Sequence, residues 1–160
     1  LRISPGRRRL LGEAIGELIR AAWLVRIHSF PSYAEGLGKA RAGDPAPIGE
    51  GDLAELQDIR WALTRWNKLL AGKFTCLMLA IAGKRMLARR RVPNSLVLGV
   101  KCAIQVQVGD ARRDLAAHAW LRVPQGVLIG DEARIGYTPV VSFHHDREVT
   151  GLFKRQISRR

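Results

Sequence analysis

"SLVLGVKCAIQVQVG", residues 95–109, marks the point at which the chain changes from helical to extended periodicity. Apolar and polar residues alternate in its second half and β-branched residues become frequent, as they do in strands. We expect two short strands here, and three more in "LAAHAWLRV", "GVLIG" and "YTPVVSF" (115–123, 126–130 and 137–143). The separating segments, "GDARRD", "PQG" and "GDEARIG", are rich in turn residues. The C-terminal half therefore predicts an antiparallel meander.

The first half of the chain has a different period. Apolar residues recur at three- and four-residue spacings over 6–28 and 52–70, which predicts two amphipathic helices. Ser4-Pro5 is a start signal for the first helix, and Gly72 is a stop signal for the second. A third helix begins near Cys76, where Thr75 can cap it, and runs through residue 88. The segment 29–51 predicts a loop with one short helical turn, so the fold class is α+β.

Length and composition suit one globular domain over residues 1–160. Hydrophobic residues make up 47% of the chain, but no apolar run reaches the roughly 18 residues that a membrane span needs. The N-terminal apolar stretch carries Glu13, Glu17 and Arg20 and does not resemble a signal peptide. The chain has 2 cysteines, too few for a disulfide framework and without the CxxC spacing of a zinc site. These features favour a cytoplasmic protein that needs no cofactor and does not bind a membrane.

The net charge of +13 raises the question of an anionic partner. Clustered basic residues are the electrostatic signature of phosphate binding. Here they are spread over 7–9, 89–91 and 155–160, without the aromatic residues that form a single-strand binding platform. A nucleic acid is therefore the less favoured partner, and an acidic peptide or protein explains the charge equally well.

Three residues have the order of a thiol acyl-transfer site. Cys76 would lie in the first turn of a buried helix, where free amides and the helix dipole favour the thiolate. His118 lies in a predicted strand, and Asp131 follows just after the next strand, so the two could meet across the sheet. A carboxylate that orients the histidine would complete a Cys-His-Asp triad. We expect His118 and Trp120 to face the start of the third helix, with Ala119 and Leu121 on the opposite face.

Each of these residues also has an ordinary structural interpretation, as a small core cysteine, a hydrogen-bonded core histidine and a solvated turn carboxylate. Only their order as a set favours catalysis. Cys102 lies away from any helix start and is expected to pack. The adjacent His144 and His145 point to opposite faces, which predicts surface residues and not a metal site. We expect Trp23, Trp61 and Trp66 to pack in the core, and Trp120 to line the site or the core.

Four motifs together resemble a known family. They are "FTCLMLAIAGKRMLARRRV" (74–92), "NSLVLGVK" (94–101), "AAHAWLRV" (116–123) and "YTPVVSF". Their order and spacing are similar to the transglutaminase-like cysteine peptidases of lasso peptide biosynthesis, the B-proteins, which remove the leader from the precursor. The resemblance covers roughly residues 5–143. The sequence departs from the family's pattern at Arg91, where the family usually has glycine, and at Arg122, where it commonly has glutamate. Glu132 beside Asp131 leaves the third triad member ambiguous.

The resemblance implies a papain/transglutaminase-like fold and a thioester acyl-enzyme. Cys76 would be the nucleophile, His118 the general base and acid, and Asp131 the residue that orients His118. The backbone N–H of Cys76 would be one oxyanion donor. Implied partners are the leader region of the precursor peptide, a leader-recognition domain or separate protein, and a lasso cyclase. Two alternatives stay open: a transglutaminase-like acyltransferase, in which an amine resolves the thioester, and a non-enzymatic basic module in which Cys76 and His118 only pack.

Overall fold

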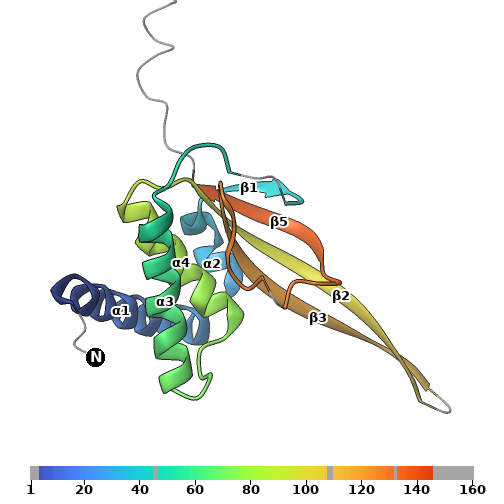
Figure 1. The fold of residues 1–160 in the computed structure, drawn as a ribbon. Helices are drawn as coiled ribbons and strands as arrows, with labels where there is room; N and C mark the ends of the chain where they lie inside the picture. The colour runs from blue at the N-terminus through green and yellow to red at the C-terminus, as the bar shows by residue number, and fades with distance from the viewer. Residues whose placement is uncertain (1–3, 45–46, 108–109, 132, 146–160) are drawn as a thin grey trace, which may run out of the picture.

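The computed structural model describes residues 4–44, 47–107, 110–131 and 133–145, and the side chains of residues 103–114 lie outside that description. The order of elements confirms the α+β class, with helices first and strands after them (Figure 1). The helical elements are α1 (Pro5–Ile27), α2 (Phe30–Ala34), the short 3-10 helix η1 (Glu35–Leu37), α3 (Leu53–Leu69) and α4 (Cys76–Arg89). The strands are β1 (Lys39–Ala42), β2 (Asn94–Gln107), β3 (Asp110–Val123), β4 (Gly126–Ile129) and β5 (Thr138–His145).

The long helices begin where the sequence predicted. The Ser4 hydroxyl accepts the Arg7 amide at the start of α1, and Pro5 occupies the first turn. The Thr75 hydroxyl accepts the amide of Met78 at 3.3 Å and caps α4, so that Cys76 is its first residue. Side-chain oxygens at these positions replace hydrogen bonds that the first turn of a helix lacks. The caps therefore fix where α4 starts, and with it where Cys76 lies.

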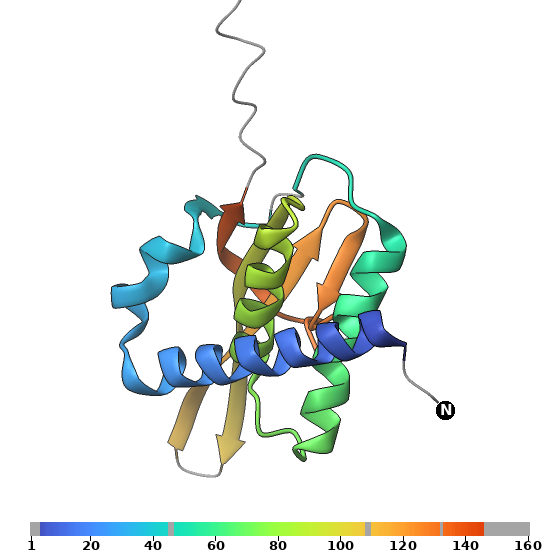
Figure 2. The same cartoon turned by 90° about the vertical axis from the view of Figure 1, so that its left-hand side faces the viewer.

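α4 is the central helix, packed between α1, α3 and the sheet (Figure 2). Gly83 is where it comes closest to β3: a Cβ added there would lie 2.8 Å from Cδ2 of Leu121 and 3.3 Å from Cδ1 of Leu63. A larger residue would push the helix away from the sheet. The core on this side of the sheet is formed by side chains from these helices and from β2–β5, among them Leu18, Ile59, Ile81, Leu87, Leu96, Leu121 and Phe143.

The five strands form one antiparallel sheet in the order β1-β5-β2-β3-β4. Two expectations are corrected here. The segment 95–109 is not two short strands, because β2 continues to Gln107 and pairs with β3 from Ser95 onward. The segment "GDARRD" is mostly strand for the same reason, since pairing with β2 overrides the turn propensity of its residues.

The last strand also differs from a simple meander. β5 pairs with β2, at the opposite side of that strand from β3, and does not continue from β4. β1, which the sequence did not reveal, then pairs with β5 through Lys39–Ala42. All of its residues are exposed, so it has no apolar alternation by which it could be recognised.

An ion-pair network joins α1 to the end of α4. Glu17 on α1 is only 4% exposed and pairs with Arg85 at 2.6 Å and with Arg89. Glu13 accepts hydrogen bonds from Arg90 at 2.8 and 2.7 Å, and these lower the pKa of its carboxyl. Arg90 also pairs with Glu55 of α3 at 2.8 Å, and its hydrogen bond with Glu13 raises the pKa of its guanidinium. The arginine-rich end of α4 therefore fastens three helices together.

α4 ends in a Schellman motif that places a non-glycine residue in the left-handed region. The amide of Arg91 bonds to the carbonyl of Ala88, the amide of Val92 bonds to that of Leu87, and Arg91 has φ 55°. The lasso peptide B-proteins that the sequence resembles usually have glycine at the position of Arg91. We expect Arg91→Gly to raise the free energy of unfolding by about 0.5–1 kcal/mol, since glycine adopts this φ without steric penalty.

Denaturant unfolding of the wild type and the variant would measure this difference. Arg60→Gly is a matched control, because Arg60 lies exposed inside α3 at a helical φ. That change should lower the free energy of unfolding by about 1 kcal/mol. A loss of stability in Arg91→Gly similar to that of the control would contradict the structural interpretation of the α4 terminus.

Several burial expectations are wrong. Trp23 is 57% exposed on α1, whereas Trp61 and Trp66 pack partly against the core as expected. Cys102 is exposed and does not pack. His144 is 3% exposed and hydrogen-bonded to Ser142, so it is not a surface residue. Among the described residues, none of the helices has the length and hydropathy that crossing a bilayer requires.

Candidate active site

Cys76 occupies the first position of α4 and is partly buried against the core. Its own amide and that of Leu77 precede the first amide that Thr75 binds, so they have no intrahelical acceptor. Its thiol forms no hydrogen bond with any residue that the structure describes. A sulfur atom and free backbone donors therefore lie together at the start of the central helix, as the sequence predicted.

His118 lies on β3 where that strand still pairs with β2 but has no partner on its β4 side. β4 pairs with β3 only from Leu121 to Val123, so His118 is beyond the end of β4. There the imidazole Nε2 hydrogen-bonds the carbonyl of Gly130 at 3.1 Å, in the turn that follows β4. The ring also stacks on Trp120, with centroids 6.1 Å apart, and contacts Tyr137 at 5.3 Å. His118 is thus held by a turn, a strand neighbour and a second aromatic ring.

The Gly130 hydrogen bond determines the tautomer of His118. A carbonyl oxygen can only accept, so Nε2 must carry the proton in this contact. The neutral ring then has its lone pair on Nδ1, which is the nitrogen available to take a proton from a thiol. Nε2, the nitrogen that an orienting carboxylate would bind, is occupied in this structure by the Gly130 carbonyl.

Asp131 follows Gly130 directly but does not contact His118. Its carboxylate pairs with Arg134 at 2.7 Å, and the side chain is about half exposed. Standard backbone geometry places the Asp131 Cα within about 6 Å of the His118 ring nitrogen that Gly130 binds. The backbone of Asp131, the third predicted triad member, therefore lies close to His118, whereas its side chain points toward solvent. Glu132, the competing carboxylate, lies outside the described residues.

The two faces of β3 do not follow the expected orientation. Ala119 and Leu121 belong to the core with α4, and Leu121 lies against Gly83. Strand alternation then puts His118 and Trp120 on the face that α4 does not cover. Trp120 lies there over Gly99, where an added Cβ would come within 2.6 Å of its ring. The expectation that Ala119 and Leu121 point away from the helix is wrong.

Cys76 and His118 nevertheless lie at a similar level of the fold. Cys76 precedes Gly83 by seven residues, or about 10 Å along the helix axis. His118 precedes Leu121 by three residues, or about 10 Å along β3. α4 and β3 run in the same general direction from these points to the Gly83–Leu121 contact (Figures 1 and 2). No hydrogen bond joins the two side chains among the described residues.

Arg122 explains one departure from the resembled family. Where a glutamate is common, Arg122 pairs with the carboxylate of Asp44 at 2.8 Å and donates to its backbone carbonyl at 3.0 Å. Arg122 shares the strand face of His118 and Trp120. Arg122 therefore binds the segment after β1 to the face of the sheet on which His118 lies.

Tyr137 is the residue that sequence analysis missed. It is half-buried, its ring is tilted by 46° to that of His118, and it precedes β5. Tyr137 directly follows Gly136 and precedes a strand, as aromatic residues commonly do, so the sequence gave no sign that its ring would contact His118. Its role depends on the path of residues 130–137, which local sequence does not determine.

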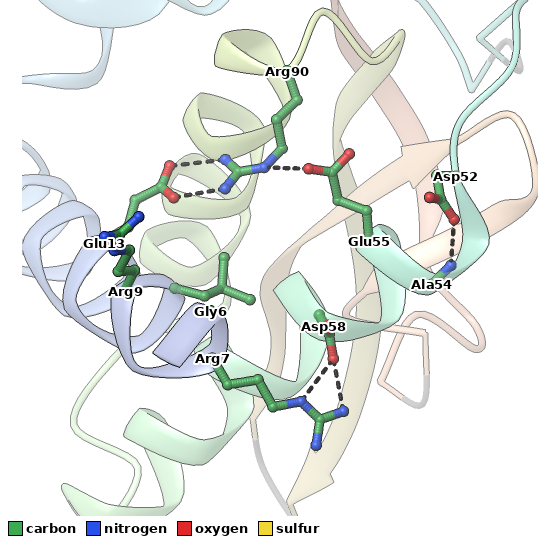
Figure 3. Close-up of a pocket in the computed structure, with 10 residues that line it drawn as sticks. Gly6, Arg7, Arg9, Glu13, Asp52, Ala54, Glu55, Asp58 and Arg90 are labelled. Atoms are coloured by element: carbon green, nitrogen blue, oxygen red, sulfur yellow. Dashed lines mark hydrogen bonds and ion pairs between the residues drawn. The ribbon is translucent and has the colours of Figure 1, made fainter. Parts of the chain in front are cut away.

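A cavity of about 410 Å³ lies elsewhere, between the start of α1 and the start of α3 (Figure 3). Arg90, Glu13 and Glu55 form one wall, and the 2.8 Å pair of Arg7 with Asp58 forms another. Arg90 follows Cys76 by 14 residues along α4, which is about 20 Å. This charged cavity is therefore separate from the Cys76–His118 region.

Comparison with protein families matches residues 17–142, most of the chain, to the transglutaminase-like superfamily. The chain belongs to the transglutaminase-like superfamily. The matched range contains Cys76, His118 and Asp131. Comparisons with curated proteins and with solved structures found no match. Membership of the superfamily fits cysteine peptidases and acyltransferases in general, both of which use a thiol to carry an acyl group. Among the described residues, no three His, Cys, Asp or Glu side chains are grouped as metal ligands would be.

Proposed function

We propose that this protein is a cysteine peptidase that cleaves a peptide through a thioester on Cys76. The observation that carries the proposal is the position of Cys76 as the first residue of the central, capped helix of a transglutaminase-like domain. The free amides at that helix start supply donors for a developing oxyanion. His118, with its lone pair on Nδ1, is the proposed base; because it lies on the face of β3 that α4 does not cover, the reaction requires its ring and the Cys76 thiol to approach each other.

The reaction would follow from these groups. Nδ1 of His118 takes the thiol proton, and Sγ of Cys76 attacks the scissile carbonyl, whose oxygen takes up the negative charge near the Cys76 and Leu77 amides. The carbon–nitrogen bond then breaks, the imidazolium gives its proton to the leaving amine, and a thioester remains. Water attacks the thioester while His118 again accepts a proton, which releases a carboxylate and the thiol.

Asp131 is proposed as the residue that orients His118 and stabilises its charged form. The support is its backbone position, one residue after the carbonyl that already holds the ring. Release from Arg134 would free the carboxylate to turn toward the imidazolium that forms during reaction. The Arg134 pair is a surface pair, and such pairs contribute only about 0–1 kcal/mol, so substrate binding could readily break it.

The finer proposal is that the substrate is a lasso peptide precursor, cleaved between leader and core. Its support is the resemblance of the four sequence motifs, and the net charge of +13, which suits an acidic peptide. The proposed partners are the leader region of the precursor, a leader-recognition domain or protein that presents it, and a cyclase that closes the ring afterwards. A cytoplasmic location is part of the same proposal.

The experiment combines the purified protein with a synthetic leader–core peptide and the recognition protein, and follows the products by mass spectrometry in heavy-oxygen water. Peptide hydrolysis should place one heavy oxygen on the new carboxylate, and added hydroxylamine should divert part of the acyl group to a hydroxamate. Formation of only amine-linked product, with no hydrolysis, would favour the acyltransferase alternative. Absence of any acyl transfer, with simple binding of the peptide, would favour the non-enzymatic module.

A further inference from the structure

The outward face of α1 has an exposed apolar stripe. The inner side of the helix buries Ala14, Leu18 and Ala21 completely. Its opposite side exposes Ile19, Trp23 and Ile27 to 60%, 57% and 66%. Successive four-residue spacings place these side chains in one row along the helix. α1 lies outermost, across α3 and α4 (Figure 2), and the exposed fractions show that the described elements leave this row open to solvent.

Arginines flank the stripe on both sides. At 100° per residue, Arg8 and Arg26 fall on one edge of the row and Arg9 and Arg20 on the other. All four are exposed, and Arg8, Arg9 and Arg26 form no ion pair with any described residue. Arg20 only reaches Glu17 at a distance of 3.9 Å. The face is therefore apolar at its centre and positively charged along its edges.

The acidic residues of α1 bind mainly the arginines of α4. Glu13 and Glu17 lie on the flank of the helix next to Arg20, and both pair with Arg89. Glu17 also reaches Arg20, but among the described residues neither glutamate pairs with Arg8, Arg9 or Arg26. Gly12 and Gly16 fall within the outward face, and no atom lies within 4 Å of a Cβ built on either. The N-terminal half of the face is thus flat and open, and its C-terminal half projects three large apolar side chains.

We propose that the outward face of α1 docks an acidic protein segment in which apolar side chains are flanked by aspartate or glutamate. Charge complementarity supports this partner: four exposed arginines flank the stripe, and Arg8, Arg9 and Arg26 pair with no carboxylate among the described residues. Arginine binds carboxylates through two parallel hydrogen bonds, and a central tryptophan is a frequent anchor of protein interfaces. A membrane is disfavoured because three apolar side chains form a narrow stripe compared with the apolar face of an interfacial helix.

The docking surface is independent of the proposed catalysis. Its residues lie on α1, and none of them is part of the Cys76–His118 region. Binding can therefore be measured without any substrate turnover. Loss of activity with binding retained would count against the proposed function alone, and loss of binding with activity retained would count against the docking surface alone.

The probe is a fluorescent synthetic helix with leucines on one face and glutamates on both flanks, titrated with the full chain at low salt. We expect binding that weakens with salt, and about tenfold weaker binding for Trp23→Ala and for Arg20→Glu. Leu69→Ala and Arg65→Glu are matched controls, because both residues are exposed on α3. They should change the affinity by less than about twofold.

Circular dichroism of each variant would show that the helices remain formed. The proposal is overturned if the acidic helix does not bind, or if the α1 and α3 variants bind it equally. It is also overturned if vesicles of phosphatidylcholine and phosphatidylserine in equal parts bind the chain through Trp23 while the acidic helix does not.

Discussion

Cys76→Ala is expected to lower the rate of acyl transfer by about 10³-fold or more while the protein remains folded. The variant retains a small side chain at the start of α4 but has no thiol to form a thioester. The cap on this helix is made by Thr75 and Met78, so it does not depend on the cysteine side chain. Single-turnover cleavage of the peptide, with the melting temperature measured in parallel, would separate a chemical defect from a folding defect.

Cys102→Ala is the matched control for this change. Cys102 is the other cysteine, lies exposed on β2, and has no role in the proposed reaction. Its replacement should leave the rate within about twofold of the wild type. If Cys102→Ala abolished the reaction and Cys76→Ala did not, the nucleophile would be misassigned.

Asp131→Asn is expected to lower kcat by about 10²–10⁴-fold with little change in substrate binding. Asparagine keeps the shape of the side chain but cannot stabilise the charged imidazolium of His118. The effect should appear in kcat more than in KM, because the charge forms during the reaction and not on binding. The pH dependence of kcat should also change, which a purely structural role in the turn would not produce.

Arg134→Ala is the control for the turn itself. It breaks the same 2.7 Å ion pair but leaves the carboxylate, and should therefore retain most of the rate. Glu132→Gln should likewise have a far smaller effect than Asp131→Asn. If Asp131→Asn and Arg134→Ala were equally active, the Gly130 carbonyl would be the group that orients His118, and the third member would be a backbone atom.

The helices were predictable because their signals are local. Thr75 and Ser4 cap the helices as predicted, and the apolar spacing of 6–28 and 52–70 corresponds to α1 and α3. The position of Cys76 at a helix start followed from these signals alone. The exposure of Trp23 did not, because an apolar residue on an amphipathic helix can lie on either side of a narrow stripe.

The sheet was predictable in kind but not in pairing. Alternation identified the regions of β2–β5, but it does not determine which strands become neighbours. β5 pairs with β2 and not with β4, and β1 pairs with β5, which local sequence did not predict. His144 is buried against expectation. Local sequence also did not determine which face of β3 turns toward the helices. Leu121 and His118 lie on opposite faces of the strand, and the contact of Leu121 with Gly83 decides which face α4 covers.

Cys76 is proposed to be a thiol activated by the helix start and by His118, and its rate of alkylation measures that activation. Iodoacetamide labelling at pH 6, followed by peptide mass spectrometry, measures the rate at each cysteine of the same molecule. We predict that Cys76 is labelled faster than Cys102 although Cys102 is the more exposed, and that His118→Ala removes most of this difference. Equal rates at the two cysteines, unchanged in His118→Ala, would show that the Cys76 thiol is not activated.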